Sequence, residues 1–212
     1  MKETLVGEVK ITRFGHSSFL LEWKDKLIYI DPYVLPKTPK PADFILITHD
    51  HFDHCANVDK LTKLPTKIIA TKACLPLLRG VIVKAVVPNE TIDMGPIVIK
   101  TVPAYNPQQA FHPRGSGVGY IIQLGDVKIY HSGDTELIPE MKDFSRDEIT
   151  VALLACGGTY TMDISQAVQA AKTIKPKVAI PMHYGYIRGT AADPQEFARA
   201  LKGSGIEVRI LE

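Results

Sequence analysis

The sequence has little cysteine and no long apolar run. Its three cysteines, Cys55, Cys74 and Cys156, are widely spaced and form no CxxC pair, which excludes the disulfide framework of a small secreted domain. No stretch approaches the roughly 20 apolar residues of a membrane span. The start, Met-Lys-Glu-Thr-Leu, lacks the apolar segment of a signal peptide. We therefore expect a cytoplasmic protein with no membrane partner.

The sequence also lacks an excess of either charge. Its 25 basic and 23 acidic residues leave a formal charge of +2 over 212 residues, so electrostatics disfavours a nucleic-acid partner. A small-molecule substrate is the expected partner, and the composition makes no prediction about the oligomeric state. A hydrophobic content of 45% suits one globular domain over residues 1–212. A chain of this length can bury a core without stabilising disulfide bonds or metal ions.

Short apolar segments rich in β-branched residues indicate a chain built largely from strands. We expect strands at residues 9–12, 18–21, 27–30, 44–47, 67–71, 81–86, 97–102, 119–123, 127–131 and 178–180. The strands at residues 119–123 and 127–131 flank Leu124-Gly125-Asp126, which is prone to form a turn, and so predict a hairpin. Three prolines make residues 36–41 a loop, because proline cannot donate a backbone hydrogen bond.

Three segments predict helices. One is short and lies near residues 73–78. A second follows Asp163, a suitable N-cap, and runs to Ile174 before Pro176, with three alanines on one face. A third starts at Asp193-Pro194, where an acceptor at the cap is followed by proline in the first turn and by a glutamate three residues on. The composition thus predicts a mixed α/β protein.

One stretch concentrates groups that bind metals or protons. Residues 48–55 read Thr-His-Asp-His-Phe-Asp-His-Cys and follow directly after an apolar strand. Residues two apart at a strand end project to the same side, so His49 and His51 can bind one ion, while Asp53 and His54 on the next turn face another. His131, Asp134 and His183 also follow apolar strands, so several strand ends can meet at one site.

The pattern His49-x-His51-x-Asp53-His54 resembles the signature of the metallo-β-lactamase superfamily of metal-dependent hydrolases. Matches along the whole chain support the resemblance: Gly-His-Ser at 15–17, Ile-Asp-Pro at 30–32, Ala-Asp at 42–43, Tyr-His-Ser-Gly-Asp-Thr at 130–135 and Pro-Met-His-Tyr-Gly at 181–185. They are similar to the compact branch near the ascorbate-6-phosphate lactonase-like and metal-dependent hydrolase groups. The resemblance implies an αββα sandwich of two mixed sheets flanked by helices, with metals at one edge.

The resemblance also implies a ligand set. His49 and His51 would bind the first metal, Asp53, His54 and His183 would bind the second, and Asp134 would bridge both. The chain departs from the family at the third ligand of the first metal, where Asn106 stands in place of a histidine and His112 follows six residues later. Because an amide oxygen is a poorer zinc ligand than imidazole, we predict His112, with Asn106 as the alternative.

Other polar residues near these motifs have two interpretations each. His16 and His131 are either ligands or groups that hold ligands by hydrogen bonds, and we leave both out of the metal set. Asp31 and Asp43 either hold the second ring nitrogen of a ligand or cap turns. Cys55 is read as a small buried residue rather than a ligand. Arg114 is either an anion contact for the substrate or a solvated loop charge, and the second interpretation is preferred.

The ligand set predicts hydrolysis by water activated between two divalent ions, zinc first and manganese or iron as alternatives. The ions would share a hydroxide, and Asp53 would orient it and assist proton transfer, so no Ser or Cys nucleophile is required. The resemblance implies an ester, lactone or phosphodiester substrate. Two alternatives stay open: an iron-dependent redox enzyme with the same ligands, and a non-catalytic metal-binding protein. A nuclease has no supporting charge excess.

Overall fold

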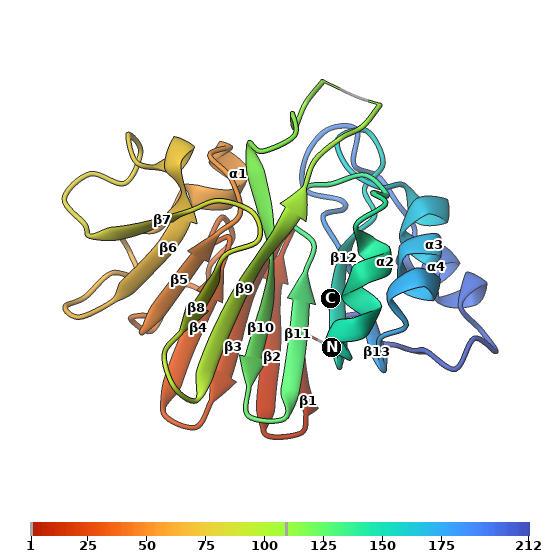
Figure 1. Ribbon diagram of the computed structural model, residues 1–212, viewed down its shortest axis with the longest axis horizontal. Helices are drawn as coiled ribbons and strands as arrows, with labels where there is room; N and C mark the ends of the chain where they lie inside the picture. The colour runs from red at the N-terminus through yellow and green to blue at the C-terminus, as the bar shows by residue number, and fades with distance from the viewer. Residues whose placement is uncertain (1, 109) are drawn as a thin grey trace.

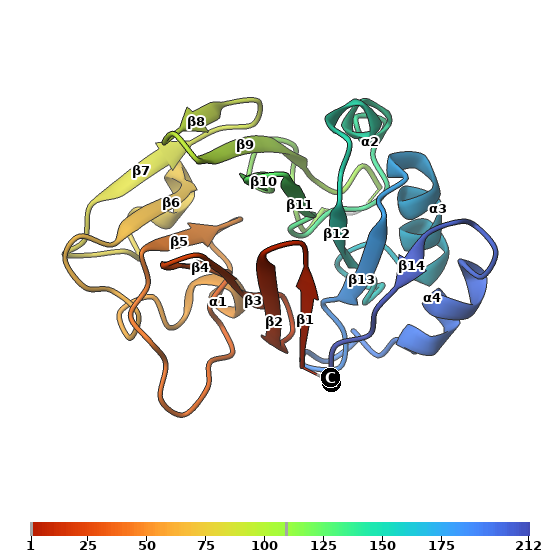
Figure 2. The same cartoon turned by 90° about the horizontal axis from the view of Figure 1, so that it is seen from below.

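Two seven-stranded sheets pack face to face in the computed structural model, which describes residues 2–108 and 110–212 (Figures 1 and 2). The first sheet contains, in spatial order, β1 Glu3–Val6, β2 Val9–Gly15, β3 Ser18–Trp23, β4 Lys26–Ile30, β5 Phe44–Ile47, β6 Lys67–Thr71 and β7 Val83–Val86. The second contains, from the opposite end of the chain, β14 Glu207–Val208, β13 Val178–Met182, β12 Val151–Ala155, β11 Val127–His131, β10 Gly117–Leu124, β9 Ile97–Ala104 and β8 Thr91–Asp93.

Each sheet is mixed in the same way. The strands β1 to β4 pair antiparallel and β4 to β7 pair parallel. In the second sheet β8 to β11 pair antiparallel and β11 to β14 pair parallel. As a result, β2, β4 and β5 are parallel to one another in the first sheet, and β9, β11 and β13 are parallel to one another in the second. Their carboxyl ends therefore define a common edge in each sheet, where open sheets place ligands.

The core between the sheets follows from alternation along the strands. In β2 the burial alternates at every residue, with Val9 and Ile11 turned inward, because successive side chains of a strand point to opposite faces. The strands β5, β12 and β13 are buried throughout, as expected for parallel strands covered on both faces. Hydrogen bonds join the sheets at the edge: Tyr120 donates its hydroxyl to the Ile47 carbonyl at 2.7 Å.

The helices lie outside the sheets (Figure 2). The outer face of the second sheet is covered by α2 Met141–Phe144, α3 Ile164–Ile174 and α4 Pro194–Ala200, and an apolar cluster lies beneath them. The first sheet is covered more thinly by α1 Phe52–Cys55, a 3-10 turn at Lys72–Cys74 and the loops around them. A second 3-10 turn follows α2 at Ser145–Asp147. The α/β sandwich fold class is confirmed, with helices concentrated on one side.

The predicted strands are all present, with small shifts at their ends. The hairpin turn contains only Gly125 and Asp126, because Leu124 already pairs with Val127. Asp163 caps α3 through a capping box with Gln166, and Asp193 caps α4, as predicted. The helix predicted at residues 73–78 was wrong: only the 3-10 turn at Lys72–Cys74 forms there. Pro76 lacks the backbone N–H that a continued helix would need. Among the described residues, no helix is both long and apolar enough to cross a membrane.

Candidate metal centre

The candidate site lies where the carboxyl ends of strands from both sheets meet. His16 follows β2, Asp31 follows β4, and His49 stands two residues after β5. From the second sheet come Asp134 after β11 and His183 directly after β13, while His112 lies on the loop after β9. The short helix α1 adds Asp53 and His54. The strand directions therefore explain why residues distant in sequence share one edge of the sandwich.

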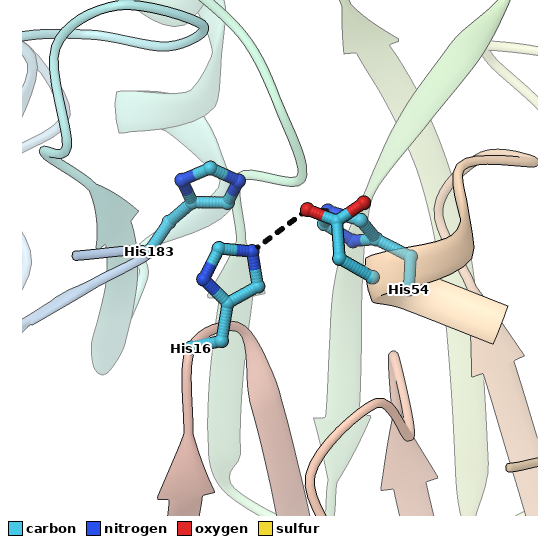
Figure 3. Close-up of side chains that lie close together, drawn as sticks. His16, His54 and His183 are labelled. Carbon is cyan, nitrogen blue, oxygen red and sulfur yellow. Dashed lines mark hydrogen bonds and ion pairs between the residues drawn. The ribbon is translucent and has the colours of Figure 1, made fainter. Parts of the chain in front are cut away.

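These side chains form two groups. Within each group, the nitrogen and oxygen atoms that could bind a metal all lie within 4.8 Å of one another. The first group is His49, His51 and His112, and the second is His16, Asp53, His54 and His183 (Figure 3). A third set, His49, His54 and Asp134, overlaps both and lies between them. All seven predicted ligands are thus brought together, and His51 is the only exposed residue among the members of these three sets.

Asp134 lies between the two groups. Its Oδ2 is 3.5 Å from His112 Nε2 and 2.9 Å from His183 Nε2, and its Oδ1 is 3.3 Å from His54 Nε2. Although burial alone would raise the pKa of this carboxyl, the charges of His183 and His54 hold it well below its usual range. Asp134 is therefore an ionised carboxylate in contact with both groups.

The third member of the first group is His112 and not Asn106. His112 Nε2 is 3.2 Å from His51 Nδ1, which in turn is 3.0 Å from His49 Nε2. Asn106 instead stands behind His112, with its Oδ1 2.5 Å from His112 Nδ1. Burial lowers the pKa of His112 and, more strongly, that of His49. Both rings are therefore neutral at neutral pH and keep the lone pair that a metal ligand requires.

His16 joins the second group, although it was left out of the predicted metal set. Its Nε2 lies 3.0 Å from Asp53 Oδ2 (Figure 3), and its ring centroid is 3.9 Å from that of His183. The backbone links the same pair, since the His183 N–H donates to the His16 carbonyl at 3.1 Å. The Gly-His-Ser motif was the available signal, but it does not reveal that the end of β2 faces the end of β13.

Asp53 has a depressed pKa despite its burial. Desolvation by burial would raise the pKa, but the hydrogen bond with His16 and the charge of His54 together hold it below its usual value. Asp53 is therefore ionised at neutral pH. Its carboxylate lines the cavity above the two groups, which makes it available both to a metal and to a proton.

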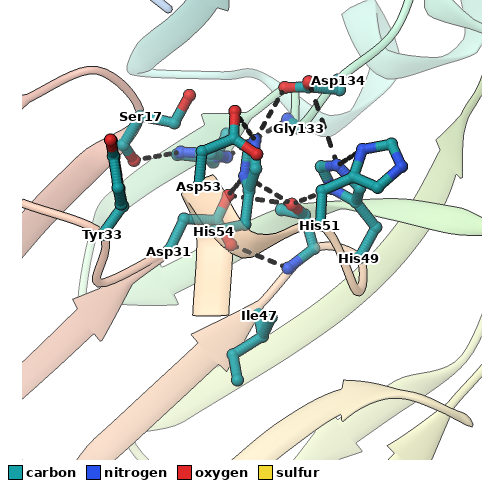
Figure 4. A network of polar contacts seen from close by, with 12 residues as sticks. Ser17, Asp31, Tyr33, Ile47, His49, His51, Asp53, His54, Gly133 and Asp134 are labelled. Carbon is teal, nitrogen blue, oxygen red and sulfur yellow. Dashed lines mark hydrogen bonds and ion pairs between the residues drawn. The ribbon is translucent and has the colours of Figure 1, made fainter. Parts of the chain in front are cut away.

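Asp31 holds His54 from behind (Figure 4). Its Oδ2 is 2.7 Å from His54 Nδ1, and the same carboxylate accepts hydrogen bonds from the backbone N–H and the hydroxyl of Thr48, each at 2.8 Å. This contact leaves His54 Nε2 directed toward Asp134. Burial would lower the pKa of His54, yet the charges of Asp134 and Asp31 raise it well above its usual value. The two carboxylates thus favour the protonated form of His54 when no metal is bound.

The remaining polar candidates lie outside the cluster. His131 donates from Nε2 to the Ser17 carbonyl at 3.1 Å and belongs to neither group. Asp43 accepts a hydrogen bond from the Leu27 N–H and so joins the starts of β4 and β5. Cys55 is half-buried rather than buried, and its thiol lies near the His51 carbonyl. Arg114 pairs with Glu140, which makes it a surface charge.

Three strained backbone positions coincide with this site. His16, Asp31 and His183 have positive φ angles of 50°, 44° and 58°; the other non-glycine residues with positive φ among the described residues are Lys24, Asn89, Glu148 and Lys175, outside the site. Such conformations each cost on the order of 1–3 kcal/mol and persist only where surrounding contacts impose them. Here the contacts are visible for His16, because buried Arg13 donates to its carbonyl at 3.2 Å and to the Leu211 carbonyl at 2.9 Å. Part of the backbone strain is thus located at residues that orient the donor atoms of the site.

Four buried polar atoms of the site make no well-aligned hydrogen bond among residues 2–108 and 110–212, although three of them lie near a charged partner: His54 Nε2 is 3.3 Å from Asp134 Oδ1, and His183 Nε2 is 2.9 Å from Asp134 Oδ2. They are His54 Nε2, Asp134 Oδ1 and both ring nitrogens of His183. Leaving a buried polar atom unsatisfied costs about 1–3 kcal/mol, so four such atoms at one place require an explanation. A bound cation would satisfy those that point into the cluster. The nitrogen and carboxylate donors suit zinc, manganese or iron.

Comparison with known proteins agrees with this geometry. A family model described as a beta-lactamase superfamily domain matches residues 10–183. The chain is 37% identical over 212 residues to a metal-dependent hydrolase of Nanoarchaeum equitans, with 96% of each protein covered. Among solved structures, Igni18, a metallo hydrolase of the archaeon Ignicoccus hospitalis, has a TM-score of 0.82 at 30% identity and covers 96% of this chain and 95% of its own. A protein of Parabacteroides distasonis reaches a TM-score of 0.86 at 37% identity, over 96% of this chain and 93% of its own.

Proposed function

Because the chain belongs to the β-lactamase superfamily and is a metal-dependent hydrolase, we propose that it binds two divalent ions and hydrolyses an ester, a lactone or a phosphodiester. The observation that carries the proposal is the position of Asp134, whose carboxylate lies next to both histidine groups: Oδ2 is 3.5 Å from His112 of the first group and 2.9 Å from His183 of the second. Such a carboxylate suits a bridge between two ions. His54 Nε2 and Asp134 Oδ1 are buried and make no well-aligned hydrogen bond, which supports metal binding independently of any family resemblance.

We assign His49, His51 and His112 to the first ion and Asp53, His54 and His183 to the second, with Asp134 shared. His16 is an additional candidate on the second side, either as a ligand or through its hydrogen bond to Asp53. Zinc is the preferred metal, because neutral imidazole and carboxylate are its usual oxygen and nitrogen ligands. Manganese and iron remain alternatives for the same donors.

Such ions, when bound, would supply a water of lowered pKa as the nucleophile and would polarise the substrate oxygen. The protein's own groups determine where this happens. Asp53 is ionised and lines the cavity, so its carboxylate can accept a proton there. His16 holds the Asp53 carboxylate through the 3.0 Å contact, and Asp31 fixes the ring of His54.

The cysteines offer no alternative nucleophile. Cys74 and Cys156 are buried, and burial raises the pKa of each thiol to about 12, so both stay protonated at neutral pH. The half-buried Cys55 does not line the cavity over the site. All three thiols are free, which also suits the cytoplasmic location that forms part of this proposal.

The test is metal content measured together with turnover. Protein reconstituted with zinc should bind close to two ions per chain, and metal removal should abolish hydrolysis of a panel of lactones, carboxylic esters and phosphodiesters. One ion or none after reconstitution would contradict the dinuclear site. Bound iron together with oxygen consumption would instead favour a redox enzyme, and full metal loading without turnover of any panel member would favour a non-catalytic role.

A further inference from the structure

The cavity over the candidate metal centre has a polar part and an apolar rim. Its volume is about 260 Å³, which is below the ~300–1,000 Å³ typical of pockets for drug-sized ligands. Its lining combines five polar residues of the candidate metal centre, His51, Asp53, His112, Asp134 and His183, with four apolar or aromatic residues, Phe52, Phe111, Tyr160 and Ile187, which we call the rim. The space therefore fits a small molecule with both a reactive polar group and an apolar group.

Two rim side chains are unusually exposed. Phe52 is 63% and Phe111 is 49% accessible to solvent, although burying a Phe side chain typically contributes about 1.5–3 kcal/mol. Both are held by aromatic neighbours: Phe111 packs edge-to-face on Tyr160 at 4.8 Å, and Phe52 packs edge-to-face on Tyr33 at 5.7 Å. The rim is thus a supported apolar surface beside the reactive groups, and a ligand in the cavity would cover it.

The rim provides no positive charge for an anionic substrate. Among the described residues, the cavity lining contains neither lysine nor arginine. Arg114, which lies on the same loop between β9 and β10 as Phe111, pairs with Glu140 and lies 4.9 Å over the Tyr105 ring. The buried carboxylate of Glu136 accepts a hydrogen bond from Asn106. This acidic group lies next to the residue that contacts His112 of the cavity lining. A charged substrate tail would lose its hydration against Phe111 without gaining a partner.

We propose that the substrate is a small uncharged carboxylic ester or lactone whose acyl group packs against Phe111 and Phe52. This inference rests on the proposed hydrolytic function and narrows it by disfavouring phosphodiesters. In the reaction a water oxygen bonds to the acyl carbon and the bond from that carbon to the alkoxy oxygen breaks. The water protons are shared between the acid and alcohol groups of the products, and no oxidant or reductant is consumed.

The kinetic test uses a pair of substrates that differ in one charge. 4-Nitrophenyl butyrate and mono(4-nitrophenyl) succinate have the same leaving group and acyl chains of equal carbon number, but the succinate ends in a carboxylate. The zinc-loaded protein should hydrolyse the butyrate with a kcat/KM at least about tenfold higher, after subtraction of the rate of metal-free protein. A tenfold ratio corresponds to about 1.4 kcal/mol of transition-state discrimination. An equal rate or a preference for succinate would overturn the inference.

Variants of the rim separate contact from folding. Phe111→Ala should raise the KM for the butyrate by about five- to tenfold and change that for the succinate by less than about twofold. The reason is that only the apolar butyryl group is stabilised by contact with the Phe111 ring. Phe111→Leu, which keeps an apolar side chain, should restore most of the discrimination. Leu5→Ala is the matched control, since Leu5 is 64% exposed on β1. An unchanged butyrate to succinate ratio in Phe111→Ala would contradict the proposed role of the ring.

A binding measurement is independent of turnover. Butyramide and succinamate present the same contrast without a scissile ester, and saturation-transfer NMR can compare them on metal-free protein. Butyramide should give the stronger signal, and Phe111→Ala should reduce it. If the loaded protein hydrolyses neither ester yet shows this preference, the proposed hydrolysis of such esters fails while the apolar subsite stands. If butyramide does not bind preferentially, the subsite itself is refuted.

Discussion

The carboxamide oxygen of Asn106 lies 2.5 Å from Nδ1 of His112. The other end of the amide donates to the Tyr160 carbonyl at 3.0 Å and to Glu136 at 3.3 Å, which fixes its orientation. An amide oxygen can only accept, so His112 must donate from Nδ1 and keep a free lone pair on Nε2. Asn106 thus selects the tautomer in which His112 can bind a metal beside His49 and His51.

This relationship predicts different effects for the two residues. His112→Ala should lose the first ion at limiting zinc, whereas Asn106→Ala should keep it with roughly 10–100-fold weaker affinity, as is typical when a group that orients a ligand is removed. Elemental analysis and competition with a chelator measure both quantities. Gln123→Ala, which removes an exposed amide on the distant hairpin, is the control. Loss of the ion from Asn106→Ala alone would identify the amide as the ligand.

Asp134 is predicted to be indispensable for hydrolysis. Asp134→Ala should leave the fold intact and abolish turnover, because the two ions would lose their shared anionic ligand and the attacking water its placement. Circular dichroism checks the fold, and hydrolysis is measured at saturating zinc. Asp143→Ala removes an exposed carboxylate from α2 and should retain full activity. An active, fully metallated Asp134→Ala protein would contradict the bridge.

Asp31 should matter for both stability and metal binding. It is completely buried and contacts His54 Nδ1 at 2.7 Å while accepting two hydrogen bonds from Thr48. Asp31→Ala should lower the free energy of unfolding by about 3–5 kcal/mol, because one partner of a buried ion pair is removed. Zinc affinity should also fall. Denaturant unfolding of metal-free protein gives the first quantity. Asp43→Ala, which loses one contact to the Leu27 N–H, should cost clearly less, and equal costs would refute the special role of Asp31.

The three thiols should differ in reactivity. Burial raises the pKa of Cys74 and Cys156 to about 12, so at pH 7 almost no thiolate is present and reagents cannot reach the sulfur. Cys55 is half-buried, and burial raises its pKa as well. Iodoacetamide should therefore label Cys55 slowly in native protein and all three residues after unfolding, as mass spectrometry can determine. Rapid labelling of Cys74 or Cys156 in the native state would contradict the packing around them.

Much of the fold was predictable because strands and caps are local features. The alternation of Val9 and Ile11 with polar neighbours identifies β2, and the acceptor at Asp163 with Gln166 three residues later identifies the start of α3. The segment at residues 73–78 shows where local reasoning fails, since Pro76 stops a helix that the apolar spacing favours. The strands β1, β8, β12 and β14 were not predicted.

By itself, the sequence determined the chemistry of the site: the residues of the 49–54 motif, Asp134 and His183 are the right donors for divalent metals, and each follows an apolar segment. Only the tertiary structure decided the roles that depend on distance. It brought His112 to His49 and His51, placed Asn106 behind it, added His16 to Asp53, and paired Arg114 with Glu140 on the surface. The physical reason is that residue identity sets what an atom can bind, whereas the meeting of strand ends from two sheets sets what lies within its reach.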